Sequence, residues 1–134
     1  MKCSFIGHRD SIGLEAVIYP EIKKMMKAGI TEFYSGGMGN FDKMCEKAVK
    51  ELGGTLVFVP YNMKQVKLRD GQWYDAVFCP FGSKEYEKFD IPNRNKWLVE
   101  QCDIFLCNVK RPGGAMHTFN YAVKMKKTVI NLAQ

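Results

Sequence analysis

The sequence predicts an α/β protein with a three-layer, Rossmann-like fold, in which helices cover both faces of a mostly parallel sheet of five to six strands. Two observations support this class. Short apolar runs typical of buried strands alternate along the chain with longer segments whose apolar residues recur at helical spacing. Two glycine-rich turns, at 35–42 and 111–118, each lie between such a strand and such a helix. A helix start with exposed backbone N–H groups is a ready anion site, so these turns also locate candidate ligand contacts.

Length and composition favour one domain that spans residues 1–134. The chain is 46% hydrophobic and 25% charged, which supplies a core without disulfides or structural metal. It has an odd number of cysteines, five, with no C-x-x-C pair, and only two histidines. It starts directly with a strand pattern and contains no run of about 18 consecutive apolar residues. We therefore expect a cytoplasmic protein with reduced thiols, no metal, no required cofactor and no membrane partner.

The net charge of +6 raises the question of a nucleic-acid partner. The lysines recur on the polar faces of predicted helices, however, at Lys23, Lys24, Lys27, Lys43, Lys47, Lys50, Lys124, Lys126 and Lys127. No RNA-recognition, zinc-finger or basic-zipper pattern accompanies them. A nucleic-acid partner is therefore an alternative that the sequence does not favour.

The first half of the chain predicts three strands separated by two helices. Strands are expected at 3–7, 31–35 and 55–59, where short apolar runs end at a glycine turn or a proline. The apolar stripes of the two helices are Leu14, Val17, Ile18, Ile22, Met25 and Met26, ended by Gly29, and Phe41, Met44, Cys45, Ala48 and Leu52, ended by Gly53.

The second half continues the alternation with less regular spacing. Residues 62–74 are ambiguous and suggest a short helix that ends near Gly71, and 76–79 predicts a short strand before Pro80. The polar and aromatic segment 81–91 has no clear period and is a candidate lid over the site. Two helices follow, with stripes Trp97, Leu98 and Cys102 after Pro92 and Met116, Phe119, Ala122 and Val123 before the last strand. The last two strands are expected at 104–107 and 128–132.

Ligands of parallel α/β sheets bind at the carboxyl ends of the strands, near a switch in strand order. Gly7, His8 and Arg9 leave the first strand at this edge and are candidate contacts. His8 is explained equally well as a buried histidine that hydrogen-bonds the backbone. Arg9 is harder to place in a core, because guanidinium groups are rarely buried without a partner. We therefore expect Arg9 to meet the ligand.

In the first glycine turn, residues without side chains would let the backbone curl around a phosphate. The candidate contacts there are Ser35, Gly36, Gly37, Met38, Gly39 and Asp42, with Asn40 as a capping residue. Two alternatives stay open. The glycines can simply supply positive φ angles in a tight turn, and Asp42 can cap backbone N–H groups instead of binding ribose hydroxyls.

In the second turn, the candidate contacts are Gly113, Gly114, His117 and Thr118, because an imidazole and a hydroxyl then lie at the helix start. A tight structural turn is again the alternative. Arg94, beside Asn95 at the start of another helix, is either a surface residue or a bidentate phosphate clamp.

Taken together, these motifs resemble the SLOG superfamily, which unites DNA-processing protein A with the LONELY GUY-type phosphoribohydrolases, and they look closest to its small YpsA-like members. Residues 5–9 are similar to the first-strand G-x-R signature, and 35–42 to the S-G-x-x-x-G-x-D turn. Residues 93–95, followed by 102–103, resemble the family's arginine-bearing helix, and 113–118 its second glycine turn. The resemblance covers most of the chain.

The resemblance implies a nucleotide site between the two turns, with self-association as a candidate property. LONELY GUY enzymes pair an arginine with a glutamate after the second glycine turn; Arg94 matches the arginine, but 113–121 contains no glutamate. The DNA-processing branch implies single-strand binding, for which this chain shows no clear platform of aromatic and basic residues.

The sequence therefore predicts a protein that binds a nucleotide or nucleotide derivative, as a sensor or ligand-binding protein. The first alternative is an N-glycosidic hydrolase or transferase on a nucleoside phosphate, with Arg94 and Asp42 as catalytic candidates. The second alternative is a single-stranded nucleic-acid-binding module. Whether the protein is an enzyme is left open by its sequence.

Overall fold

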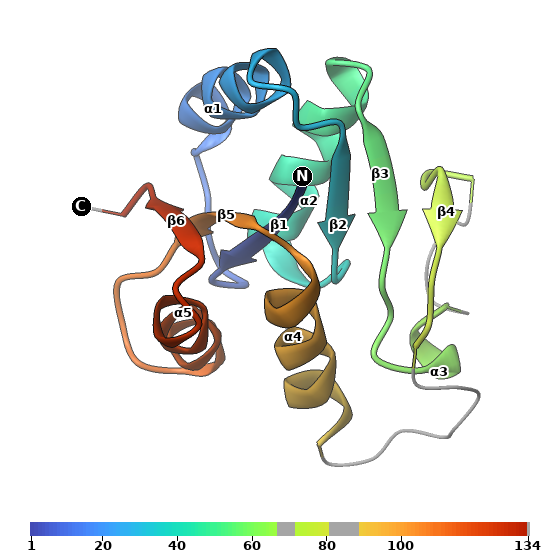
Figure 1. Cartoon of the computed structure of the whole chain (residues 1–134), viewed down its shortest axis with the longest axis vertical. Coiled ribbons are helices and arrows are strands. Elements are labelled where there is room, and N and C mark those ends of the chain that lie inside the picture. The colour runs from blue at the N-terminus through green and yellow to red at the C-terminus, as the bar shows by residue number, and fades with distance from the viewer. Residues whose placement is uncertain (67–71, 81–88, 134) are drawn as a thin grey trace.

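The computed structural model describes residues 1–66, 72–80 and 89–133, and shows a six-stranded sheet with helices on both faces (Figure 1). The strand order is β4-β3-β2-β1-β5-β6, and every neighbouring pair is parallel. The elements are β1 (Lys2–Gly7), α1 (Glu15–Lys27), β2 (Glu32–Ser35), α2 (Gly39–Glu51), β3 (Thr55–Phe58), α3 (Met63–Val66), β4 (Ala76–Val77), α4 (Asp90–Gln101), β5 (Ile104–Asn108), α5 (Gly114–Lys124) and β6 (Thr128–Asn131). The predicted fold class is confirmed.

The element boundaries differ from the sequence prediction mainly between β3 and α4. The strand expected at 76–79 consists of Ala76–Val77 alone, at the edge of the sheet. The loop expected at 81–91 is wrong at its end, because α4 begins at Asp90 and Pro92 lies in its first turn. Residues 67–71 and 81–88, which hold the end of the ambiguous helix and most of the candidate lid, lie outside the described residues.

The strand order places a topological switch at the centre of the sheet. From β1 the chain steps outward through β2 and β3 to β4, and then returns to pair β5 on the other side of β1. The two connections that leave β1 and β5 therefore run to opposite faces, which opens a crevice beyond the carboxyl ends of these strands.

Two buried clusters hold the layers together, one on each face of the sheet. On one face, Ile18 and Ile22 of α1 and Phe41 and Val49 of α2 pack against the sheet residue Phe33. On the other face, Leu98 and Val99 of α4, Cys102 just after it and Ala122 of α5 pack with Ile6, Phe105 and Cys107. In Figure 1, α4 and α5 lie side by side on the face opposite α1 and α2.

The cysteines belong to this core. Cys3, Cys45, Cys102 and Cys107 are buried free thiols, whereas Cys79 is partly exposed. Burial raises the pKa of Cys102 and of Cys107 to about 12, so neither forms the reactive thiolate at neutral pH. Within the described ranges there is no cluster of three or more histidine, cysteine or acidic side chains that could hold a metal. No helix in those ranges is long and apolar enough to span a membrane.

Candidate functional site

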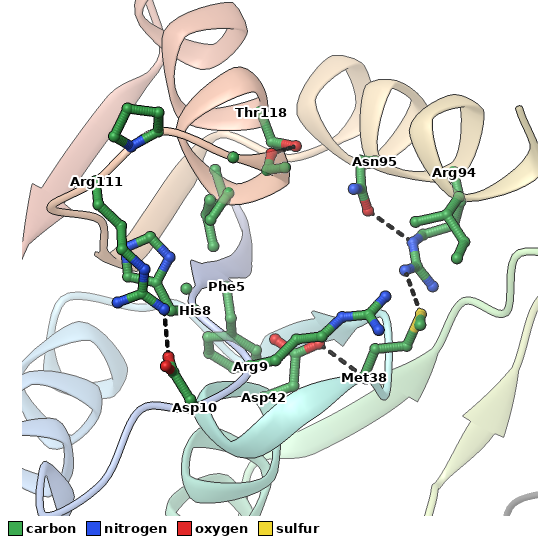
Figure 2. Close-up of a pocket in the computed structure, with 17 residues that line it drawn as sticks. Phe5, His8, Arg9, Asp10, Met38, Asp42, Arg94, Asn95, Arg111 and Thr118 are labelled. Atoms are coloured by element: carbon green, nitrogen blue, oxygen red, sulfur yellow. Dashed lines mark hydrogen bonds and ion pairs between the residues drawn. The ribbon is translucent and has the colours of Figure 1, made fainter.

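A pocket of about 470 Å³ lies at the topological switch, beyond the carboxyl ends of β1 and β5 (Figure 2). Its lining comes from the end of β1 and the segment after it, the start of α2, the first turns of α4, the loop before α5 and the start of α5. These residues are Phe5, Ile6, Gly7, His8, Arg9, Asp10, Met38, Asp42, Ile91, Arg94, Asn95, Arg111, Pro112, Gly113, Gly114, Ala115 and Thr118. Segments more than 100 residues apart in sequence thus share one cavity.

Ten of the residues predicted as contacts line this pocket: Gly7, His8, Arg9, Met38, Asp42, Arg94, Asn95, Gly113, Gly114 and Thr118. Five others, Ser35, Gly36, Gly37, Gly39 and His117, do not. The pocket also contains residues that sequence reasoning missed, of which Asp10 and Arg111 carry charge. Each lies within two residues of a predicted contact, and this closeness in sequence was the signal that could have identified them.

The first glycine turn uses its backbone groups within the protein. The Gly37 N–H donates to Ser35 Oγ at 3.0 Å, and the Met38 N–H donates to Asp42 Oδ2 at 3.1 Å. At the start of α2, the Asn40 N–H donates to the Arg9 carbonyl at 2.9 Å. These donors are therefore engaged within the protein, and the Asp42 carboxylate caps the Met38 N–H.

The glycines of this turn are required by close packing. A Cβ on Gly36 would lie 2.7 Å from Arg94 Cζ, and one on Gly37 would lie 2.7 Å from the Phe58 ring. Gly39 combines a φ of +83° with a Cβ position only 2.7 Å from Arg9 Cα. The space above these glycines is filled by protein atoms, so the turn has the structural role that the sequence left open as an alternative.

Ser35 stabilises the same turn from the interior of the protein. It is fully buried, and its Oγ donates to Glu46 Oε2 at 2.5 Å. Trp73 Nε1 and the Tyr74 hydroxyl donate to the same carboxylate at 3.1 and 3.2 Å. The predicted hydroxyl contact with ligand is therefore replaced by a buried hydrogen-bond network that holds the end of β2 against α2.

Arg94 is buried, with 3% of its surface exposed, so the interpretation as a surface residue is wrong. Its Nη1 donates to the carbonyls of Gly36 and Val59 at 2.9 and 3.1 Å. Its Nη2 lies 3.3 Å from Met38 Sδ, and its Nε donates to Asn95 Oδ1 at 2.9 Å. Figure 2 shows the guanidinium at one end of the pocket, between α4 and Met38 of the first glycine turn.

The second glycine turn differs from the first in that no described residue packs against its glycines. A Cβ on Gly113 or Gly114 would meet no atom of the described residues within 4 Å, and Gly113 has a φ of +142°. The N-cap residue of α5 is Gly113, which has no side chain to cap the first backbone N–H groups, and these have no acceptor within the helix. Thr118 donates its hydroxyl to the Gly114 carbonyl at 3.0 Å, while His117 is exposed outside the pocket. The start of α5 thus leaves its N–H groups, and the positive end of its dipole, available to an anion.

Two contacts fix the loop that precedes this turn. The buried His8 accepts a hydrogen bond at Nε2 from the Lys110 N–H at 3.1 Å, which places the proton of the neutral ring on Nδ1. Burial and the nearby Arg111 charge lower the pKa of His8. Arg111 Nη2 donates to Asp10 Oδ1 at 2.5 Å, and this bond lowers the pKa of Asp10. The loop after β5 is thereby tied to the segment after β1.

Arg9 differs from Arg94 in being exposed. Figure 2 shows its side chain extending across the pocket from the end of β1 toward Met38 and Arg94. Among the residues that the structure describes, no hydrogen bond or ion pair holds its guanidinium. Of the two arginines predicted as ligand contacts, Arg94 is thus held by protein groups and Arg9 is exposed at the pocket.

Acidification should destabilise the fold through His8. Its pKa is lower in the folded protein than the ordinary 6.5, so the unfolded chain binds the proton more readily. The His8 contribution is complete above about pH 6.5 and is lost as pH falls from there toward the folded pKa. Urea unfolding between pH 5 and 8 measures it. His8→Gln keeps an acceptor without the titration and should flatten this part of the curve; an unchanged curve would exclude His8 as the cause.

No protein-family model and no curated protein matches the sequence. Solved structures do match. The chain superimposes on DNA processing protein A (DprA) from Streptococcus pneumoniae with a TM-score of 0.73 and 19% identity, over 96% of this chain and 48% of that one. For DprA from Helicobacter pylori, whose structure addresses single-stranded DNA binding, the TM-score is 0.76 and the identity 14%, over 100% and 66% of the two chains.

A third match is the molybdenum cofactor carrier protein of Chlamydomonas reinhardtii, with a TM-score of 0.62 and 17% identity over 96% of this chain and 73% of that one. The chain spans about half of the first DprA and 66% of the second. At such identities the likeness concerns the fold. The protein has the Rossmann-like α/β fold of the two DprA structures, the fold that its motifs predicted.

Proposed function

We propose that the protein binds a nucleotide or nucleotide derivative in the switch-point pocket, with a phosphate at the start of α5. The observation that carries this proposal is the contrast between the two glycine turns. Gly36 and Gly37 are packed under protein side chains, whereas no described residue covers Gly113 or Gly114 at the start of α5. An anion can approach the peptide planes only at the second turn.

The rest of the pocket suits the remainder of such a ligand. Its volume of about 470 Å³ is in the range of small-molecule sites. Phe5, Ile6 and Ile91 offer apolar surface to a base, and the Asp42 carboxylate is an acceptor for ribose hydroxyls. Arg9 supplies a second positive group across the cavity from α5. The combination fits a ligand with one phosphate at α5 and polar groups further along.

Removing the Arg9 charge should weaken nucleotide binding about tenfold, the scale of one lost hydrogen bond to a charged group. Isothermal calorimetry with AMP, ADP and ADP-ribose, at one salt concentration, compares Arg9→Ala with the wild type. Lys47→Ala is the matched control, because it loses the same charge on the exposed face of α2. Equal losses in both variants would assign the effect to net charge, and no binding by any nucleotide would refute the proposal.

A second candidate ligand is single-stranded DNA, which the H. pylori DprA structure concerns. Salt dependence distinguishes the two ligands, because an oligonucleotide bound through several of its phosphates loses affinity steeply as the salt concentration rises. A mononucleotide that makes one phosphate contact should lose far less between 50 and 200 mM salt.

Hydrolysis of the N-glycosidic bond would use the same pocket. Asp42 lines the cavity while it accepts the Met38 N–H, which holds its carboxylate in place. Release of the free base and ribose 5-phosphate from nucleoside monophosphates, lost in Asp42→Asn while nucleotide affinity persists, would add catalysis to the proposed binding. Binding without release from any nucleotide would restrict the function to that of a sensor or carrier.

A further inference from the structure

An ion pair joins the two walls of the pocket at the proposed phosphate site. Arg111 Nη2 lies 2.5 Å from Asp10 Oδ1, and both residues line the cavity. Asp10 follows β1, whereas Arg111 stands two residues before Gly113, so the pair crosses the topological switch (Figure 2). The guanidinium is thus held by a carboxylate beside the open start of α5.

The exposure of this pair allows it to exchange partners. The Arg111 side chain is 47% exposed and that of Asp10 is 73% exposed. Exposed ion pairs contribute little to stability, because water screens both charges. A phosphoryl group carries more negative charge than a carboxylate and can accept two parallel bonds from a guanidinium. An incoming phosphate is therefore a stronger partner for Arg111 than Asp10 is.

The neighbouring contacts confine such a change to the side chain. The Lys110 N–H is fixed by His8 Nε2 on one side of Arg111, and α5 begins on the other. The guanidinium can therefore turn from Asp10 toward the α5 start while the backbone on both sides stays in place.

We propose that Asp10 is an internal competitor for the phosphate: it neutralises Arg111 in the free protein, and the ligand phosphate takes its place. This inference rests on the proposed phosphate site and adds to it a binding residue, Arg111, and a residue that limits the affinity, Asp10. Through this exchange, the affinity for phosphate depends on the Asp10 carboxylate, although Asp10 itself does not bind the phosphate.

The test is a titration with inorganic phosphate at pH 7.5, followed through the backbone amide NMR signals of Gly113 and Gly114. Asp10→Asn should bind phosphate about two- to fivefold more tightly than the wild type, because it no longer holds Arg111. Glu15→Gln is the matched control, since Glu15 is an exposed acid outside the pocket and loses the same charge. In an Arg111→Gln background, Asp10→Asn should gain no more affinity than Glu15→Gln does.

A second readout follows the carboxylate directly. Saturating phosphate should return the Asp10 pKa, held low by Arg111 in the free protein, toward its ordinary value, with His8 as the other titratable neighbour of Asp10. Carbon-detected NMR of the Asp10 carboxyl measures this. Phosphate that binds Asp10→Asn and Glu15→Gln equally, or an Asp10 pKa that phosphate leaves unchanged, overturns the exchange while the phosphate site stands. Absence of phosphate binding in every variant overturns both.

Discussion

Replacing Arg94 with leucine should lower the free energy of unfolding by about 3 kcal/mol or more, the largest effect that we expect from a residue of the pocket. The side chain is 3% exposed and bridges the carbonyls of Gly36 and Val59, so it joins the first glycine turn to the end of β3. Leucine removes these donors from the carbonyls of two buried residues, Gly36 and Val59. Urea unfolding monitored by circular dichroism measures the loss.

Arg9→Leu is the matched control for Arg94→Leu. Both substitutions remove one guanidinium from the same pocket, but Arg9 is exposed and its stability effect should lie within about 0.5 kcal/mol. Arg94→Lys should not restore stability, because a lysine cannot reproduce the planar fork that reaches two carbonyls. Equal stability of Arg94→Leu and Arg9→Leu would contradict the structural role given to Arg94. This contrast also means that lost ligand binding in an Arg94 variant cannot be read as a lost phosphate contact without a folding control.

Gly39→Ala should destabilise the protein by about 2–4 kcal/mol, through two costs that act together. The φ of +83° strains any residue with a Cβ, at roughly 1 kcal/mol. The added atom would also lie 2.7 Å from Arg9 Cα, which is backbone and can yield only if the segment after β1 moves. That movement would break the hydrogen bond from the Asn40 N–H to the Arg9 carbonyl.

Gly53→Ala separates these two costs. Gly53 has a nearly identical φ of +77°, and its Cβ position meets nothing within 4 Å. Its loss of stability should therefore be that of backbone strain alone, near 1 kcal/mol. Thermal and urea unfolding of both variants give the difference. If Gly39→Ala is no less stable than Gly53→Ala, the close approach between α2 and the segment after β1 does not constrain this turn.

The fold could be predicted because each helix and strand carries its own local signal. The helical stripe of α2 from Phe41 onward and the buried runs of β1 and β5 were visible as short-range patterns, and their alternation implies a parallel sheet. β4 was predicted too long, because a two-residue strand at an edge owes its extent to pairing with β3.

The site was predicted less completely, since a glycine turn reads the same in sequence whether ligand or protein fills the space above it. Only the structure distinguishes the two glycines, because Arg94 packs on Gly36 and no described residue packs on Gly113. The Asp10–Arg111 pair was missed for a related reason. Its partners are 101 residues apart, so no local pattern could connect them before the strand order brought β1 and β5 together.

The most direct test of phosphate binding at the second glycine turn is an AMP titration followed by the backbone amide NMR spectrum. We expect the largest chemical-shift changes at the amides of Gly113, Gly114 and Ala115, which lie at the start of α5. The amides of Gly37 and Met38, already bonded to Ser35 and Asp42, should change little. Larger shifts at Gly37 and Met38 than at Gly113 and Gly114 would contradict the assignment of phosphate to α5.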